Sequence, residues 1–369
     1  MKIAVVHDDL MRRGGGEQVA LSIMKAFPNA DLYSLCYQSH LTYEEFKNYK
    51  VNTSIFQKFV KTEKMMKWLF FPFGILAMKL LKVKGYDLVV VSGTFCGKYV
   101  NIDKRSRIFL YTFTPFRLAW NPTSYKEFNE SKGFLKGIFN LVIKCLRYVD
   151  KREAHKANYY LGMTEETAQR IKNAYGAEEV IIIHPPVKCQ NFHVDDSVEK
   201  SFFLIVSRLE FYKKVDLAIE AFNELGYPLI IVGNGSKKSE LMSMAKNNIQ
   251  FKSGLSTIEL QGLYANCKAF IFPQHEDYGI TPLEANASGR PVIAYGAGGV
   301  LETMLPYEAN KTKFTSVFFQ EQTKEALIDA IKLLETLEID SSFIRSHSMK
   351  FDESVFIQQL IQIVQDRLS

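Results

Sequence analysis

Short apolar runs alternate along the chain with longer segments whose apolar residues recur at helical spacing. β-branched and aromatic residues dominate the short runs, and this alternation is typical of parallel α/β sheets. In the first half of the chain the predicted strands are Ile3–His7, Asp31–Leu35, Leu88–Ser92, Ile108–Tyr111 and Tyr159–Gly162. In the second half they are Phe202–Ser207, Leu229–Val232, Ala269–Pro273 and Pro291–Tyr295. Helices are predicted at Val215–Leu225, Ser239–Lys246, Lys324–Leu337 and Glu353–Leu368.

Two prolines interrupt this alternation near its middle. His184-Pro185-Pro186-Val187 precedes a polar stretch, from Gln190 to Lys200, that is typical of an inter-domain linker. A length of 369 residues also exceeds one ordinary hydrophobic core. We therefore expect Rossmann-like α/β domains over residues 1–187 and 198–350. A crevice between them would bind a ligand at the carboxyl ends of the strands.

The net charge is mildly positive at +6, and the positive residues cluster. Residues 58–84 contain seven lysines and one acid, Glu63, around the apolar run Trp68–Met78. That run is about half as long as a membrane span, which needs about 20 residues. Such a segment fits a surface that rests on an anionic membrane, and it fits equally a buried helix with lysines at its edge. A second, weaker basic and apolar segment covers residues 133–147.

A few residues bear on compartment and metal chemistry. A strand begins at Ile3, so no signal peptide is expected, and no other segment is long enough to span a membrane. The five cysteines are scattered without a Cys-x-x-Cys, so we expect no disulfide and no structural zinc, and a reducing cytoplasm is the default. No Asp-x-Asp occurs and the histidines show no metal-ligand spacing. We therefore expect no metal, no other cofactor and no nucleic-acid partner.

A glycine-rich loop, Gly14-Gly15-Gly16-Glu17, follows the first strand and opens a helix. Glycines there let the backbone approach a ligand and point N–H groups at an anion. The spacing differs from the Gly-x-Gly-x-x-Gly of dinucleotide enzymes, and the chain has no P-loop. A loop whose glycines only supply positive φ angles is the structural alternative.

Two cations, Arg208 and Lys213, come straight after the strand Phe202–Ser207. At the carboxyl end of a buried strand, such a pair can neutralise a diphosphate and stabilise it as a leaving group. By itself, an Arg and Lys pair on a loop is more often simply solvated.

Two glutamates, Glu276 and Glu284, follow a predicted strand at a Glu-x7-Glu spacing. Thr281 resembles a helix N-cap with Pro282 at the first helical position, and Glu284 comes three residues after the cap, which predicts a capping box. Glu284 therefore has a structural explanation. Glu276, in a loop beside Gly279, has none and is a candidate for ligand binding.

Together these motifs resemble the family-4 retaining glycosyltransferases, which have the GT-B fold, over nearly the whole chain. The likeness rests on Gly14–Glu17, Ser207-Arg208-Leu209 with Lys213, Val232–Gly235, and the block from Glu276 through Glu284 to Gly298-Gly299 and Thr303. Glu-x7-Glu is the signature of that family. Pro185-Pro186-Val187 is similar to a linker of its mannosyltransferase-like branch, which builds bacterial polysaccharides.

The resemblance implies a role for each candidate residue. Arg208 and Lys213 would hold the diphosphate of a nucleotide sugar, and Glu276 would contact the hydroxyls of the donor sugar. The other donor-binding positions implied are the backbone of Gly14 and Gly15, Gly233 near the base, the N–H groups near Gly279 and Ile280, and Glu284 at the ribose hydroxyls.

The resemblance also implies a domain arrangement and a reaction. The N-terminal domain would take the acceptor, the C-terminal domain the donor, and a helix over residues 351–369 would return to the N-terminal domain. A hexose or 6-deoxyhexose would move with retention, by front-face attack, from a nucleotide-diphosphate sugar, with a GDP-sugar favoured. The acceptor would be a glycan or lipid-linked glycan at the cytoplasmic membrane face. The alternatives are a GT-B nucleotide-sugar epimerase and a non-catalytic donor-binding partner of another transferase.

One position departs from the family pattern. Phe113, within Tyr111–Trp120, stands where the family normally has a histidine near the C6 hydroxyl of the donor sugar. A phenyl ring cannot hydrogen-bond a hydroxyl. Phe113 and the neighbouring Arg117 are therefore candidate residues of the sugar or acceptor pocket, and Phe113 is predicted to favour a 6-deoxyhexose. Packing alone is the other interpretation of Phe113.

Overall fold

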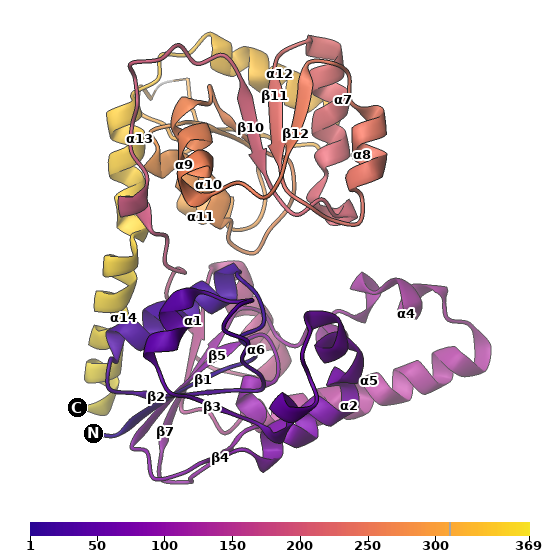
Figure 1. Ribbon diagram of the computed structural model, residues 1–369, viewed down its shortest axis with the longest axis vertical. Helices are drawn as coiled ribbons and strands as arrows, with labels where there is room; N and C mark the ends of the chain where they lie inside the picture. Colours follow the sequence, from indigo (N-terminus) through magenta and orange to yellow (C-terminus); the bar gives the residue numbers. More distant parts are fainter. Residues whose placement is uncertain (310) are drawn as a thin grey trace. The chain divides into compact units, whose positions relative to one another are not determined.

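The structure, a computed structural model, describes residues 1–309 and 311–369; the side chains of residues 63, 64, 66–72, 126 and 127 lie outside the described set. Contacts divide the chain into two units. The N-terminal unit consists of Met1–Pro185 and Phe356–Ser369, and the C-terminal unit of Pro186–Val355. Each unit has its own parallel sheet, as the α/β pattern predicts (Figure 1). The crevice between the units stays a prediction.

The sheet of the N-terminal unit has the strand order β3-β2-β1-β5-β7-β8-β9, all parallel. Its strands are β1 (Ile3–His7), β2 (Asp31–Ser34), β3 (Val51–Thr53), β5 (Leu88–Gly93), β7 (Arg107–Thr112), β8 (Tyr159–Gly162) and β9 (Ile181–Ile182). A separate short pair joins β4 (Lys82–Val83) and β6 (Asn101–Ile102). The central strand β5 is buried along its whole length, which explains its continuous apolar sequence.

The N-terminal unit also contains helices. They are α1 (Gly15–Ala26), α2 (Glu63–Leu80), α3 (Arg117–Trp120), α4 (Lys126–Glu130), α5 (Gly133–Ala154), α6 (Glu165–Tyr175) and α14 (Glu353–Leu368). The last of these, α14, buries Phe356, Leu360 and Val364 in the same cluster as Val5 and Leu161. This confirms that the C-terminal helix returns to the N-terminal unit. Among the described helices, none has the length and apolar character of a transmembrane span.

The sheet of the C-terminal unit has the order β12-β11-β10-β13-β14-β15, again parallel. The strands are β10 (Phe203–Val206), β11 (Leu229–Val232), β12 (Ile249–Lys252), β13 (Phe270–Phe272), β14 (Val292–Tyr295) and β15 (Ser316–Phe319). The helices are α7 (Val215–Leu225), α8 (Lys238–Met244), α9 (Thr257–Asn266), α10 (Ile280–Ala287), α11 (Val300–Thr303), α12 (Lys324–Glu335) and α13 (Ser341–Ser348). Neighbours Leu204 and Ile205 on β10 belong to different apolar clusters, because helices pack on both faces of this sheet.

Short 3₁₀ helices fill several connections in both units. They are η1 (Glu44–Asn48), η2 (Ile55–Lys58), η3 (Gly97–Tyr99), η4 (Pro122–Ser124), η5 (Cys189–Asn191), η6 (Phe211–Lys213) and η7 (Met349–Phe351).

The segment predicted as a linker packs in part against the C-terminal unit. Val187, Cys189 and Phe192 are buried in its apolar cluster. The N–H of Val187 donates to the carbonyl of Phe351 at 3.0 Å. This unit therefore begins at Pro186 rather than at residue 198, and it extends to Val355 rather than to residue 350.

Candidate functional site

Arg208 and Lys213 lie in the connection that follows β10. Arg208 is exposed, whereas Lys213, the last residue of η6, is buried. Both cations face the ring of Tyr212, with 5.9 Å from the Arg208 guanidinium carbon to the ring centroid and 5.1 Å from the Lys213 Nζ. The predicted cation pair is therefore gathered around one exposed aromatic side chain at the carboxyl end of β10.

Glu276 lies in the loop after β13 and forms an ion pair with Lys213. β10 and β13 are neighbours in the sheet, so their carboxyl ends bring these two residues together from segments far apart in the sequence. Gln274, which is buried, donates from Nε2 to Glu276 Oε1 at 3.4 Å. The pair places an ammonium and a carboxylate side by side, and these groups suit a phosphate oxygen and a sugar hydroxyl respectively.

Glycines let the strand-end loops of this sheet pack directly on one another. Gly298, after β14, has φ +75° and lies where a Cβ would overlap the carbonyl oxygen of Glu276. The N–H of Gly299 donates to the same carbonyl at 2.9 Å. Gly233, after β11, lies in the same way against the carbonyl of Ser207. A neighbouring loop therefore holds the backbone of the Glu276 loop, and its close approach requires glycine at position 298.

Two substitutions should separate the cost of a left-handed backbone from the cost of steric overlap at Gly298. Gly298→Ala combines a left-handed backbone with overlap on Glu276, whereas Gly226→Ala, at φ +72°, has nothing within 4 Å of the added Cβ. We expect Gly226→Ala to lower the free energy of unfolding by about 1–2 kcal/mol. Gly298→Ala should lower it by about 1–3 kcal/mol more, because of the overlap. Denaturant titrations followed by circular dichroism measure both; equal losses would contradict the tight loop packing.

The capping box predicted around Glu284 is wrong. Helix α10 begins at Ile280 with Gly279 as its N-cap, so Thr281 is already inside the first turn and caps nothing. Gly279 has φ +95°, which glycine adopts readily, and Pro282 fits the first turn because its missing N–H has no partner there anyway. Because glycine has no side chain, the N-cap of α10 accepts no hydrogen bond from the N–H groups of the first turn. Such a start is suited to an anionic or polar ligand.

Glu284 instead faces a buried tyrosine. The hydroxyl of Tyr264, which lies fully buried on α9, donates to Glu284 Oε2 at 2.8 Å. Burial raises the pKa of Glu284 from 4.5 to about 7, and the hydrogen bond from Tyr264 opposes this rise. Sequence reasoning missed Tyr264, because a single tyrosine on a helix carries no motif that links it to a glutamate on another helix.

The raised pKa of Glu284 predicts a pH dependence of stability. A carboxyl group whose pKa is higher in the folded than in the unfolded state stabilises the fold fully below about pH 4.5, and this contribution is lost as pH rises through about 7. Wild type should therefore lose up to about 3 kcal/mol over this window. Glu284→Gln should lose less across the same window. The free energy of unfolding, measured from pH 4.5 to 8, tests this. An exposed-residue control, Glu220→Gln, should follow wild type, and identical pH profiles for all three proteins would contradict the burial argument.

In the N-terminal unit, the glycine loop leads directly into a helix. Gly14 is the N-cap of α1 with φ −146°, and Gly15 is the first helical residue. Since neither has a positive φ, the structural alternative for this loop fails. A Cβ on Gly16 would approach the Phe113 Cε2 to 3.0 Å, so the loop needs glycine because a phenyl ring lies against it.

Phe113 follows β7 and is half-buried. Its ring packs edge-on against Tyr111, with 5.6 Å between centroids, and lies 6.3 Å from the ring of His7. Burial lowers the pKa of His7. Arg117, the first residue of α3, is exposed. Phe113 is therefore a fixed ring beside the glycine loop, with an edge open to solvent.

Acidic residues next to the glycine loop are already engaged. The carboxylate of Asp8 accepts N–H bonds from Thr94, Phe95 and Gly97 at 2.6, 3.0 and 2.7 Å, which ties the end of β1 to the loop after β5. Glu17, in the first turn of α1, is buried near Asp9. Burial and then the Asp9 charge raise the pKa of Glu17 to about 7, against the effect of Arg12. These acids stabilise the loop geometry.

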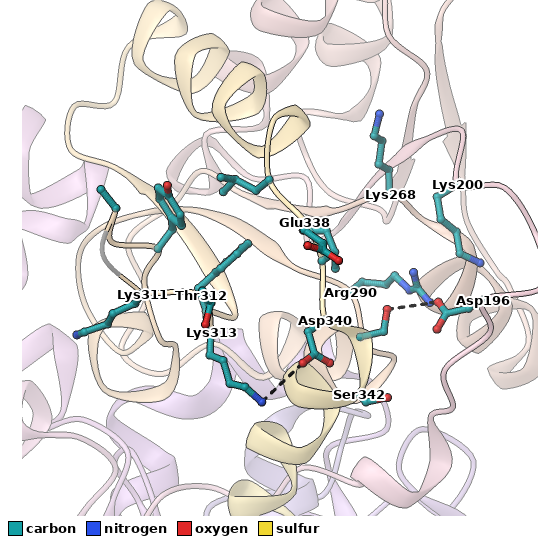
Figure 2. Close-up of a pocket in the computed structure, with 16 residues that line it drawn as sticks. Asp196, Lys200, Lys268, Arg290, Lys311, Thr312, Lys313, Glu338, Asp340 and Ser342 are labelled. Atoms are coloured by element: carbon teal, nitrogen blue, oxygen red, sulfur yellow. Dashed lines mark hydrogen bonds and ion pairs between the residues drawn. The ribbon is translucent and has the colours of Figure 1, made fainter.

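A cavity of about 940 Å³ lies elsewhere in the C-terminal unit (Figure 2). Two ion pairs lie in its lining: Arg290 contacts Asp196 at 2.6 Å, and Lys313 contacts Asp340 at 3.7 Å. None of the predicted site residues lines this cavity. Within the part of the chain that the structure describes, no three or more His, Cys, Asp or Glu side chains are grouped as metal ligands.

The chain is similar to known glycosyltransferases. Residues 191–350 match the family Glycosyl transferases group 1. Alpha-1,3/1,6-mannosyltransferase ALG2 of Candida glabrata is 26% identical over 84% of this chain and 79% of its own length. O-antigen chain mannosyltransferase C of Escherichia coli is 24% identical over 63% of this chain and 64% of its own. D-rhamnosyltransferase WbpZ of Pseudomonas aeruginosa is 26% identical over 48% and 49%, respectively.

The fold is likewise shared with a solved structure. The crystal structure of HepE from Anabaena in complex with UDP superposes with a TM-score of 0.69 at 16% identity, over 99% of this chain and 100% of that one. At this identity the likeness speaks for the fold. Residues 191–350 are therefore a group 1 glycosyltransferase domain, and the chain that carries it is a hexosyltransferase of the GT-B fold.

Proposed function

We propose that this protein transfers a hexose or 6-deoxyhexose, with retention, from a nucleotide-diphosphate sugar to a hydroxyl of a lipid-linked or polysaccharide acceptor. A GDP-sugar is the favoured donor. The observation that carries the proposal is the ion pair of Lys213 and Glu276, held at neighbouring strand ends inside the matched domain, residues 191–350. The names of the mannosyl- and rhamnosyltransferase relatives support this class of reaction.

Arg208 and Lys213 supply the positive charge that the departing diphosphate needs. Negative charge builds up on that group as its bond to the sugar breaks, so cations fixed beforehand stabilise the transition state more than the ground state. Lys213 is buried and faces Glu276, which holds its ammonium group in place. Arg208 is exposed and would contact the outer phosphate.

Glu276 accepts hydrogen bonds from hydroxyls of the donor sugar, and the backbone bonds of its loop to Gly299 support this fixed position. The start of α10 at Gly279 and Ile280 offers N–H groups to the same ligand. Glu284 accepts from the ribose hydroxyls, with Tyr264 holding the carboxylate from behind. Because carboxylates accept and hydroxyls donate, this set binds a sugar nucleotide in one orientation.

The reaction exchanges one bond at the anomeric carbon for another on the same face. The bond to the diphosphate oxygen breaks, the bond to the acceptor oxygen forms, and the acceptor proton passes to the departing diphosphate. In this scheme Arg208 and Lys213 take the part that a divalent cation plays in other transferases, and no metal is needed.

We place the reaction at the cytoplasmic face of a membrane, with residues 58–84 as the basic segment toward anionic lipid. Lys58, Lys61 and Lys82 are exposed there, which supports the proposal. The apolar run Trp68–Met78 lies in α2, and its first five side chains are outside the described set.

A turnover assay with purified protein tests the reaction. GDP- and UDP-linked hexoses and 6-deoxyhexoses are offered with and without a lipid-linked glycan acceptor, and nucleotide release and labelled product are measured. Acceptor-dependent release with a GDP-sugar is expected. Donor isomerisation without acceptor would instead establish an epimerase, and binding without turnover a non-catalytic partner. Preference for UDP-sugars would overturn the choice of base alone.

Glu276→Gln and Arg208→Ala should each lower kcat by about 100-fold or more, because each removes a contact to the reacting groups. Glu276→Gln keeps the side-chain size beside Lys213, so circular dichroism should show an intact fold. The matched control Glu220→Gln, on an exposed face of α7, should retain wild-type turnover. Full activity in Glu276→Gln would be fatal to the role proposed for Glu276.

Phe113 is proposed to select the sugar. Its fixed ring offers no hydrogen bond to a C6 hydroxyl, and one of the relatives is a D-rhamnosyltransferase, which supports a 6-deoxyhexose. Wild type should prefer a 6-deoxy donor in kcat/KM, whereas Phe113→His should shift the preference toward a 6-hydroxylated donor by about tenfold or more. Competition between the two donors measures this. The same donor preference in both proteins would mean that Phe113 only packs against its neighbours and does not select the sugar.

A further inference from the structure

Helix α5 carries an exposed apolar stripe that none of the described residues covers. Phe134, Ile138, Leu141, Cys145 and Tyr148 follow one another at intervals of four, three, four and three residues, which places them on one face of the helix. All five are exposed, Phe134 at 84% and Leu141 at 63%. A soluble helix normally turns such a stripe toward the core.

The opposite face of α5 is the one that packs on its own unit. Leu146 and Val142 join the cluster of Ala119 on α3. Asp150, fully buried, pairs with Lys98 at 2.8 Å and accepts a hydrogen bond from Trp120 Nε1 at 2.9 Å. The helix is thus anchored by one face, so the stripe does not belong to its packing surface. Figure 1 shows the first half of α5 extending beyond the sheet of its unit.

Positive charge lies beside the stripe. Residues 131–149 contain four cations and no Asp or Glu. At about 100° per residue, Lys144 and Lys151 fall in the sector next to the stripe, whereas Lys136 and Arg147 lie about 140° or more from its centre. Around the axis of α5, the exposed apolar stripe therefore lies between a cationic sector and the buried face.

Helix α2 continues this surface. Its exposed residues Phe73, Leu76 and Leu80 also lie at helical spacing. Ile75 on α2 packs in the same cluster as Val142 of α5, and Lys79 lies 3.7 Å from Glu153. The two helices therefore pack against each other, and each carries exposed apolar residues.

We propose that α5, together with the end of α2, lies in the interface of an anionic lipid bilayer. The stripe enters the boundary of the acyl chains, and the adjacent cations meet the lipid phosphates. Charge complementarity favours anionic lipid over a second copy of the chain. In a two-fold dimer that pairs the stripes, the cations of one copy would lie close to the cations of the other. The inference adds α5 to the basic segment 58–84 of the proposed function, and vesicle binding tests it without donor or acceptor.

Cys145 provides a reporter inside the stripe. It is exposed, whereas Cys36, Cys96, Cys189 and Cys267 are buried. An environment-sensitive fluorophore attached to Cys145 of the full chain should shift to the blue with vesicles of phosphatidylcholine and phosphatidylglycerol. Little change is expected with phosphatidylcholine alone. An unchanged spectrum with the anionic vesicles would overturn the proposal.

Variants then identify the surface that binds. Flotation with the anionic vesicles measures the partition coefficient between membrane and water. Phe134→Ser/Leu141→Ser should reduce this coefficient by about tenfold or more. Ile258→Ser, which removes an 80% exposed apolar side chain from α9 in the other unit, is the matched control and should bind as wild type does. Lys144→Gln/Lys151→Gln should weaken the preference for anionic lipid.

Two results would contradict the assignment. Wild-type binding by Phe134→Ser/Leu141→Ser would mean that α5 does not hold the membrane. A dimer in light scattering that this double variant dissociates, without vesicle binding by wild type, would make a second copy the occupant. Failure of the transfer assay leaves both measurements unaffected, so the two proposals can fail separately.

Discussion

A lysine can be buried at the end of a strand only when a carboxylate faces it, and Lys213 with Glu276 meets this condition. Removing either charge would take the ion pair away from the other. The pair needs β10 and β13 as direct neighbours, and it needs the Glu276 loop fixed from the other side. Gly298 and Gly299 provide that fixation, since their loop touches the Glu276 backbone. The strand order and the glycine loop of the C-terminal unit thus keep these opposite charges close together.

Central strands were predictable because burial on both faces makes their sequence continuously apolar. β1, β8 and β11 have the bounds that the sequence pattern predicts. Edge strands were missed, as at β12, whose sequence Ile249–Lys252 alternates apolar and polar residues because one face is exposed. The helix at Val215–Leu225 was predictable from its apolar spacing. The short helix predicted at Ser239–Lys246 is found as α8, whereas α11, with four residues, has too few turns to show a period.

The candidate site was predictable in its residues and less so in its contacts. Motif spacing pointed to Lys213 and Glu276, but it assigned them to different parts of a ligand rather than to each other. Local capping chemistry misled at Glu284, because Gly279 with its left-handed backbone begins the helix two residues before Thr281. Tyr264 reaches Glu284 only through tertiary packing of α9 against α10. A pattern along the chain carries no information about such a contact.

The chain crosses between its units twice, at Pro185–Pro186 and again at Val355–Phe356. The N-terminal unit is therefore interrupted in the sequence, and its apolar cluster takes Phe356, Leu360 and Val364 from the very end of the chain. During synthesis this helix follows the C-terminal unit out of the ribosome. The C-terminal unit therefore has all its residues before the N-terminal unit does, although translation of the N-terminal unit begins first. In proteins made of successive domains, the N-terminal domain is usually completed first.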